Sequence, residues 1–204
     1  MSRLSYIFLF LATSLWASPL LEKAAGTIEN RSLRIELEWI HTPAAGMGKP
    51  TRSKGVLRLA SGNRFVFRSQ SLTLASDGTT LWQYMPAAKQ VLIQKLSNID
   101  PSQLPVGLLR NALHAHEVSV QKEVHDGVPA QRIELKADKA PLSRYQSVQL
   151  WIRVASHEPL ELNVRDDQGA GIAWKLRRIQ DFEPDAKTFV FNVPAGVNVV
   201  DTRK

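Results

Sequence analysis

Residues 33–39 read LRIELEW, with apolar side chains at the odd positions and arginine or glutamate at the even positions. Successive side chains of a β-strand point to opposite faces of the sheet, so this period of two predicts a strand with one apolar and one charged face. The same alternation returns in six further stretches of the chain. They lie at residues 57–59, 65–67, 72–74, 148–154, 160–164 and 172–176.

Short turn signals separate these stretches. They are Gly62-Asn63, Asp77-Gly78, Asp126-Gly127, Gln168-Gly169 and Pro194-Ala195-Gly196. Strand, short turn and strand in succession favour an antiparallel meander, because parallel neighbours need long crossover connections. The chain shows no internal repeat and no linker. We therefore predict a mainly β (α+β) fold, built on one antiparallel sheet of about eleven or twelve strands.

The first residues have the parts of a secretory signal peptide. Arg3 precedes an almost uninterrupted apolar run from Leu4 to Trp16, and Ala17 offers a small residue for cleavage. A membrane anchor is the alternative, but the run ends before Pro19 and is shorter than the roughly 20 residues that span a bilayer. We predict a signal peptide at 1–17, cleavage near Ala17, export to the periplasm, and a single domain at 18–204.

Composition narrows the classes of partner. The chain has no cysteine, so we expect no disulfide and no lipid anchor on an N-terminal cysteine. Its net charge is +7, but lysine and arginine are spread singly and do not gather in one run. Together with export, this argues against nucleic acid. The spread positive charge is typical of a solvated surface that contacts membrane surfaces transiently, and we expect a monomer.

Two segments have helical character instead of period two. Apolar residues from Pro19 to Asn30 recur at helical spacing and predict a short amphipathic helix. Residues 98–113 read NIDPSQLPVGLLRNAL, with Asp100 as a predicted cap and Pro105 suited to a first helical turn. This second helix is too short to be stable alone and must pack on the sheet, as a lid does. The predicted lid residues are Leu104, Val106, Leu108 and Leu109.

The segment at residues 75–96, ASDGTTLWQYMPAAKQVLIQKL, resembles the LolA family of periplasmic lipoprotein carriers, in which S-D-G is followed by L-W-x-Y-x-P and a Q-V strand. The likeness extends upstream to residues 55–57 and 63–67 and downstream to Leu104-Pro105 and 108–111. Residues 189–197 are similar to the family's closing strand. The order and spacing of these motifs carry the resemblance from the first helix to the end of the chain.

The resemblance implies an open, strongly curved, incomplete β-barrel closed by short helices over an apolar cavity. It also implies a soluble carrier that takes lipoprotein acyl chains from an inner-membrane transporter to an outer-membrane acceptor. On this likeness Phe65 is a cavity residue, and Trp82 with Tyr84 is the cavity's aromatic pair. Strand alternation adds Leu57, Leu59, Phe67, Leu72 and Leu74 to the predicted cavity wall.

One departure from the family leaves the cargo open. Members usually carry Arg-Pro in the turn before that phenylalanine, and the arginine helps to latch the lid, whereas this sequence has Ser61-Gly62. Arg58 and Arg64 are the candidates for a replacement latch. The departure keeps two alternatives in view: a LolA-like carrier of a glycolipid or another long-chain product, and a periplasmic lipid-sensing module.

No enzymatic pattern is complete. The most suggestive cluster is His114, His116 and Glu117. The two histidines would share a face in a strand, but no carboxylate or cysteine pattern at ligand spacing accompanies them. Residues 46–51, GMGKPT, resemble a phosphate loop only briefly, because Pro43 stands where the first glycine of that pattern should be and Pro50 where its Ser or Thr should be. No G-x-S-x-G elbow occurs. We expect a binding protein without a catalytic residue, metal or cofactor.

Overall fold

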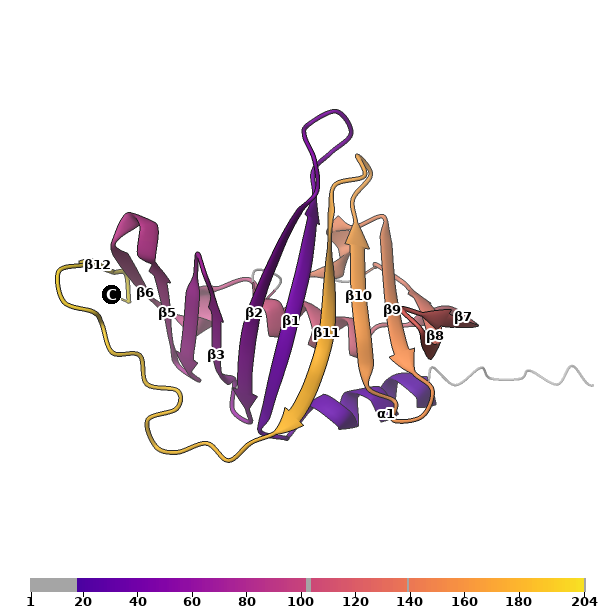
Figure 1. Ribbon diagram of the computed structural model, residues 1–204, viewed down its shortest axis with the longest axis horizontal. Helices are drawn as coiled ribbons and strands as arrows, with labels where there is room; N and C mark the ends of the chain where they lie inside the picture. The colour runs from indigo at the N-terminus through magenta and orange to yellow at the C-terminus, as the bar shows by residue number, and fades with distance from the viewer. Residues whose placement is uncertain (1–17, 102–103, 139, 204) are drawn as a thin grey trace, which may run out of the picture.

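The structure, a computed structural model, describes residues 18–101, 104–138 and 140–203, so the predicted signal peptide lies outside the described residues. The described part contains one twelve-stranded sheet of order β12-β6-β5-β4-β3-β2-β1-β11-β10-β9-β8-β7. Figure 1 shows this order. The strands are β1 (Leu33–Thr42), β2 (Thr51–Ala60), β3 (Arg64–Ser69), β4 (Thr73–Asp77), β5 (Thr80–Met85), β6 (Gln90–Lys95), β7 (Glu117–His125), β8 (Val128–Leu135), β9 (Ser147–Arg153), β10 (Pro159–Arg165), β11 (Gly171–Asp181) and β12 (Asn198–Asp201).

Neighbouring strands from β6 through β7 in this order pair antiparallel, as the turn signals predict. The β7–β8 hairpin turns at Asp126 and Gly127, whose φ angles of 48° and 79° are both positive. Two positive φ angles are typical of the tight turns that match the twist of the flanking strands. The sheet is curved and does not close, since β7 and β12 remain at its two ends.

The last strand differs from the prediction. The closing strand is Asn198–Asp201, not the segment around Phe189 and Phe191, and it pairs parallel to β6. Residues 182–197 cross from β11 to the far end of the sheet without joining it (Figure 1). Parallel pairing follows because this long segment carries the chain across the outside before β12 begins.

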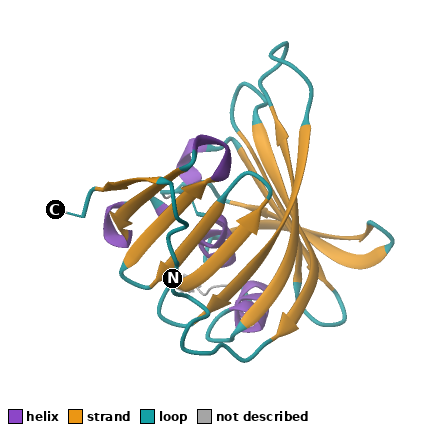
Figure 2. Cartoon of the chain, turned by 60° about the vertical axis from the view of Figure 1, so that its left-hand side comes forward, coloured by secondary structure: helices purple, strands orange, loops and turns teal. Residues whose placement is uncertain are grey.

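Two helices lie on one side of the curved sheet (Figure 2). Helix α1 (Pro19–Ile28) buries Leu21, Ala24, Ala25 and Ile28. Helix α2 (Pro105–Leu113) begins at the second proline, as predicted. Leu104 precedes the helix without a side-chain cap, and Asp100 forms an ion pair with Arg144. The predicted role of Asp100 as a cap before Pro101 depends on a turn that continues outside the described residues.

The main core fills the space between the helices and the concave face of the sheet. Short 3₁₀ turns complete its cover, namely η2 (Leu96–Asn98) and η4 (Leu142–Arg144), and Leu142 of η4 is buried. Helix α2 packs on α1 and on η4. Within the described ranges, no helix is long and apolar enough to cross a membrane.

Candidate functional site

The concave face carries most of the predicted cavity residues. Leu57, Leu59, Phe65, Phe67 and Leu74 are at most 5% exposed and belong to one apolar cluster. The pairing of the strands brings these side chains together on one face. Leu59 of β2 pairs with Phe65 of β3, and Leu57 pairs with Phe67. Phe67 in turn pairs with Leu74 of β4. The partly buried Leu72 packs against the same cluster. The sheet therefore presents a continuous apolar inner wall.

The lid residues meet this wall. Val106, Leu108 and Leu109 of α2 are buried in the same cluster, and Leu104 packs against it. Within α2, Leu109 lies three residues after Val106 and directly after Leu108, so the three side chains fall along one broad side of the helix. Helix α2 thus covers the interior with its own apolar side chains.

The predicted aromatic pair is misplaced. Trp82 and Tyr84 lie on the convex face. Trp82 pairs with Ala75 of β4, and Ala75 pairs with Val66 of β3. Val66 and Ala75 alternate along their strands with the inward-facing Phe65, Phe67 and Leu74, so Trp82 must face outward. Within β5, Leu81 is the residue that joins the main core. The family likeness identified the motif correctly but not the face, which the register of each strand pair determines.

A second, smaller apolar cluster covers this convex face. Ala60, Val66, Ala75 and Phe189 form it, with Trp82, Phe182 and Phe191 packed against it. The ring of Tyr84 lies 6.0 Å from that of Phe191. The aromatic pair therefore holds residues 182–197 to the outside of the sheet, and the alternating Phe189 and Phe191 are the signal in the sequence for this contact.

A hollow of about 440 Å³ opens at the edge of the lid. Its apolar lining comes from Phe65 of β3, from Leu96 of η2 and the following Ile99, and from Leu104 and Val106 at the start of α2. Asn63, Arg110 and Asn111 supply a polar side. The volume lies within the roughly 300–1,000 Å³ of typical ligand pockets. A lining that combines apolar and polar side chains suits a molecule that has an apolar tail and a polar head.

Two polar contacts attach α2 to its surroundings. Arg110 Nη1 donates a 2.9 Å hydrogen bond to Asn63 Oδ1 in the β2–β3 turn. At the end of α2, His114 Nε2 lies 2.7 Å from Glu29 Oε1 beside α1. Burial lowers the pKa of Arg110 from its ordinary value, while nearby Glu29 acts in the opposite direction.

Neither predicted latch residue reaches the lid through a hydrogen bond in the described part of the chain. Arg64 Nε donates to the carbonyl of Ser61 in its own turn, and its guanidinium lies over the ring of Phe189. Arg58 stands between the inward-facing Leu57 and Leu59, and therefore points to the convex face. The arginine that bonds α2 to the turn is Arg110 of the helix itself, and Asn63 of the turn supplies the acceptor.

Close backbone approach also fixes α2. A Cβ atom on Gly107 would lie 2.0 Å from the carbonyl oxygen of Pro101. Only glycine permits this contact, because such a distance is far below van der Waals separation. Gly107 thus allows the first turn of α2 to rest against the segment that leads into it.

Two interior tryptophans extend the inner wall beyond the predicted site. Trp39 of β1 lies 5.3 Å from the ring of Phe67 and 5.5 Å from that of Trp174 on β11. Trp174 Nε1 is buried and has no hydrogen-bond partner among the described residues. Both tryptophans take part in the alternation of their strands, and this alternation is the signal that places them on the concave face.

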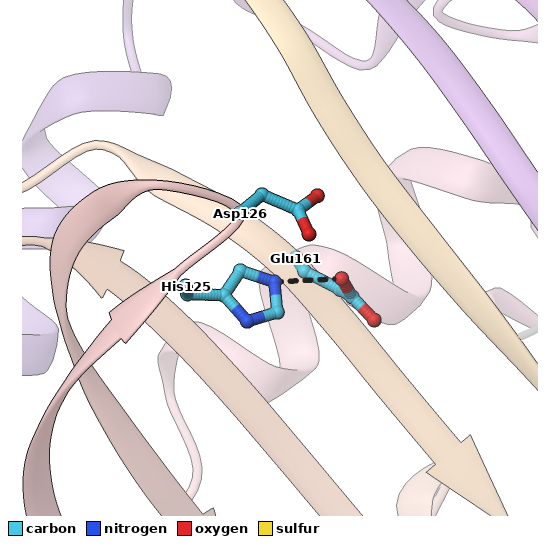
Figure 3. Close-up of side chains that lie close together, drawn as sticks. All are labelled: His125, Asp126 and Glu161. Atoms are coloured by element: carbon cyan, nitrogen blue, oxygen red, sulfur yellow. Dashed lines mark hydrogen bonds and ion pairs between the residues drawn. The ribbon is translucent and has the colours of Figure 1, made fainter.

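The convex face carries a charged cluster at the β7–β8 turn. His125, Asp126 and Glu161 bring one ligand atom each within 4.8 Å of one another (Figure 3). The ammonium of Lys175 already lies 3.0 Å from Asp126 Oδ2 and 3.2 Å from Glu161 Oε2. Because a cation of the protein occupies this position, the residues form an ion-pair network that joins the hairpin to β10 and β11.

Arginine and lysine side chains of β11 hold the carboxylates of this network. Lys175 and Arg177 both donate to Asp126 and lower its pKa to about 2. Arg177 also donates to Glu38 of β1.

The histidines at 114 and 116 line a separate hollow of only about 100 Å³, and His114 is engaged by Glu29.

An open, curved sheet around an apolar interior, with short helices as its cover, defines a half-barrel binding protein. Residues 41–192 match the model of the family described as outer membrane lipoprotein carrier protein LolA, so the chain belongs to this family. An outer-membrane lipoprotein carrier protein of Haemophilus influenzae (strain PittEE) is 27% identical over 192 residues, which cover 90% of both chains.

Solved structures share the fold. An uncharacterized conserved protein from Thermus thermophilus superposes with a TM-score of 0.59 at 10% identity, over 89% of this chain and 96% of that one. The Mycobacterium tuberculosis lipoprotein LppX superposes with a TM-score of 0.52 at 15% identity, over 86% of this chain and 98% of that one. The predicted family and the predicted half-barrel are thereby confirmed.

Proposed function

We propose that this chain is a non-enzymatic periplasmic carrier that binds the acyl chains of a lipoprotein beneath α2. It receives this cargo from an inner-membrane transporter and delivers it to an acceptor at the outer membrane. The observation that carries the proposal is the apolar hollow between Phe65 and the start of α2, which continues into the inner wall of the sheet. Membership of the lipoprotein carrier family supports the choice of cargo.

The energetics explain why a carrier is needed. Transfer of an acyl chain to water costs about 0.8 kcal/mol per methylene, or roughly 12 kcal/mol for a chain of sixteen carbons. Free diffusion across an aqueous compartment is therefore negligible. A protein that replaces the membrane interior with its own apolar wall removes most of this cost.

The closed lid explains how uptake and release are balanced. Val106, Leu108 and Leu109 of the lid are buried in the interior. An entering acyl chain displaces α2 and restores apolar contact with the wall, so the burial gained by cargo is offset by burial lost by the helix. The net affinity then stays moderate, and the cargo can leave for a better acceptor.

A second cargo class is favoured by one observation, the reversed latch. The turn at Ser61-Gly62 offers no arginine, and the lid is attached through Arg110 and Asn63 instead. A different attachment of the lid suits a different guest, such as a glycolipid or another long-chain product. Mass spectrometry of lipid extracted from the purified periplasmic protein distinguishes this guest from a triacylated lipoprotein.

Binding is tested with the delipidated protein and a fluorescent fatty-acid probe. We expect saturable binding, and at least about a tenfold loss in Leu104→Glu, because a charge would then stand in the apolar lining. Val190→Glu is the control, since Val190 is 52% exposed on the outer segment. Absence of probe binding, or equal binding by Leu104→Glu, would refute the proposal.

Transport is tested by depletion of the protein in its host. Lipoproteins should then accumulate at the inner membrane while their synthesis continues. Normal localisation combined with an altered stress response would instead indicate a lipid-sensing module.

A further inference from the structure

The convex face carries a basic trough that the proposed carrier function does not use. It is a hollow of about 760 Å³ over β1, β2, β3 and β11, on the opposite side of the sheet from the apolar interior. We call it the outer trough. Its charged lining consists of five cations and two carboxylates, namely Arg34, Lys54, Arg58, Arg68, Arg177, Glu36 and Glu38.

The two carboxylates are already engaged. Glu36 Oε1 lies 2.7 Å from Arg34 Nη1, and Glu38 Oε2 lies 2.9 Å from Arg177 Nη2. Arg177 reaches Glu38 because it is the extra residue of a bulge in β11, opposite Glu36 and Leu37. The acids of the trough therefore pair with Arg34 and Arg177, and Lys54 stands opposite Glu38 across the β1–β2 ladder. Arg58 and Arg68 are the two cations of the trough that neither form an ion pair with a described residue nor stand opposite a carboxylate.

Arg58 and Arg68 remain uncompensated. Neither makes a hydrogen bond or an ion pair with any residue that the structure describes. Arg58 stands directly opposite Arg34 across the β1–β2 ladder. Like charges directly opposite each other destabilise a sheet. The Arg34–Arg58 pair therefore favours a negatively charged partner.

The register brings these guanidinium groups to one place. Arg58 is opposite Val66 and Arg68 is opposite Val56, so the two arginines are diagonal neighbours on β2 and β3. Diagonal pairs lie about 7–8 Å apart, within reach of long side chains. Val56 and Val66 form an apolar floor between them. One anion held above this floor would meet Arg34, Arg58 and Arg68 together.

The geometry favours phosphate over carboxylate. A carboxylate has two coplanar oxygens, which match the fork of a single guanidinium. A phosphate has oxygens pointing in several directions and carries more charge, so it can bind several guanidiniums that approach from different strands. We propose that the outer trough is a binding site for a phosphate group, presented by a lipid head group or by a soluble phosphorylated molecule.

The trough also has room for more than one phosphate. A second hollow of about 980 Å³ shares Glu38, Lys54, Ser69 and Gln70 with it and extends to Arg52. The exposed Ser71 also lines this extension, and its hydroxyl is suited to polar head-group atoms. The site is separate from the acyl-binding interior and does not depend on the proposed carrier function.

Calorimetric titration with pyrophosphate tests the site. We expect saturable binding that weakens with ionic strength and falls at least about tenfold in the double variant Arg58→Gln and Arg68→Gln, which removes two charge-assisted contacts. The matched control, Lys23→Gln with Lys95→Gln, removes the same charge from exposed positions outside the trough and should bind as the unchanged protein does. Circular dichroism verifies that each variant is folded.

Vesicles distinguish the two sources of phosphate. Co-sedimentation with phosphatidylglycerol vesicles, but not with phosphatidylcholine vesicles, and its loss only in the trough variant would indicate a lipid head group. Pyrophosphate binding without vesicle binding would indicate a soluble phosphorylated ligand. Equal loss in the trough variant and the control, no binding of either probe, or binding of a polyglutamate peptide alone would overturn the proposal.

Discussion

Arg110 on α2 donates a hydrogen bond of 2.9 Å to Asn63 in the β2–β3 turn, and so joins the lid to the sheet. The turn places Asn63 at a φ of 57°, and Gly62 before it at 73°, conformations that both residue types tolerate. The polar side of the lid-edge hollow is formed by the same two residues that make this hydrogen bond, together with Asn111. Attachment of α2 and the entry of cargo that we propose thus involve the same pair of side chains.

Removal of this pair should loosen the lid. In Arg110→Ala we expect faster amide exchange in α2 and faster entry of a fatty-acid probe, because the helix loses a contact that spans two elements. A double-mutant cycle with Asn63→Ala should give a coupling of about 0.5–1.5 kcal/mol, as for a typical hydrogen bond. Hydrogen exchange and stopped-flow fluorescence measure the two effects.

Arg64→Ala is the matched control for the latch. Arg64 begins β3 directly after the same turn, but among the described residues its side chain contacts the carbonyl of Ser61 and the ring of Phe189 and makes no hydrogen bond to α2, so exchange in α2 should be unchanged. If Arg64→Ala accelerates amide exchange in α2 as much as Arg110→Ala does, then Arg64, one of the two residues predicted from the sequence, also holds the lid. A coupling of zero between Arg110 and Asn63 would show that the contact does not hold the lid.

Four tryptophans of the described chain can report where an acyl chain lies. Trp39 and Trp174 face the interior, whereas Trp82 and Trp151 lie on the convex face. A brominated fatty acid quenches only rings that it touches, so bound chains should quench the protein in which Trp82 and Trp151 are replaced by phenylalanine. The protein with Trp39→Phe and Trp174→Phe should be quenched little. Stronger quenching of the outer pair would place the guest outside the half-barrel.

The sequence predicts faces well within a strand and less well between strands. The alternation in β1 places Leu33, Ile35 and Leu37 together, and all three are buried in the main core. Alternation does not determine which phase of β5 faces inward, because that depends on the register with β4. Trp82 and Leu81 are both apolar, so the pattern at this strand is ambiguous. The family likeness assigns the larger residue to the interior, where the structure has Leu81.

Contacts between segments that lie far apart in the chain could not be predicted from the sequence either. The resemblance places Phe189 in the closing strand, but it packs on Val66 and Ala75, which lie more than a hundred residues earlier. The Arg110–Asn63 contact likewise depends on how α2 crosses the β2–β3 turn. Neither residue type signals such a partner, because local spacing carries no information on tertiary contacts of this length.

Asp126 should make stability depend on pH at the acid end. Hydrogen bonds from Lys175 and Arg177 lower its pKa to about 2, from an ordinary value of 3.8. A depressed carboxyl pKa stabilises the fold at pH values above the unfolded pKa, and this contribution is lost as the pH falls through the folded pKa. Between pH 4 and 2 the melting temperature of Asp126→Asn should therefore fall less steeply than that of the unchanged protein.

Asp167→Asn is the control for this pH effect. Asp167 is exposed in the β10–β11 turn and makes no hydrogen bond or ion pair with a described residue. Its replacement should leave the acid limb of the melting curve unchanged. Identical pH profiles for Asp126→Asn and the unchanged protein would show that the network contributes nothing to acid stability.

Two helical glycines provide a direct test of how α2 is seated. Gly107 touches the carbonyl of Pro101, so Gly107→Ala must displace the first turn of α2 and should cost about 1–3 kcal/mol of unfolding free energy. Gly26 in α1 has no atom within 4 Å of an added Cβ, and Gly26→Ala should stabilise by about 0.5–1 kcal/mol. The same chemical change thus has opposite signs, measured by denaturant unfolding. If both substitutions stabilise the fold, α2 does not rest on the Pro101 segment, and the lid has more freedom than its contacts indicate.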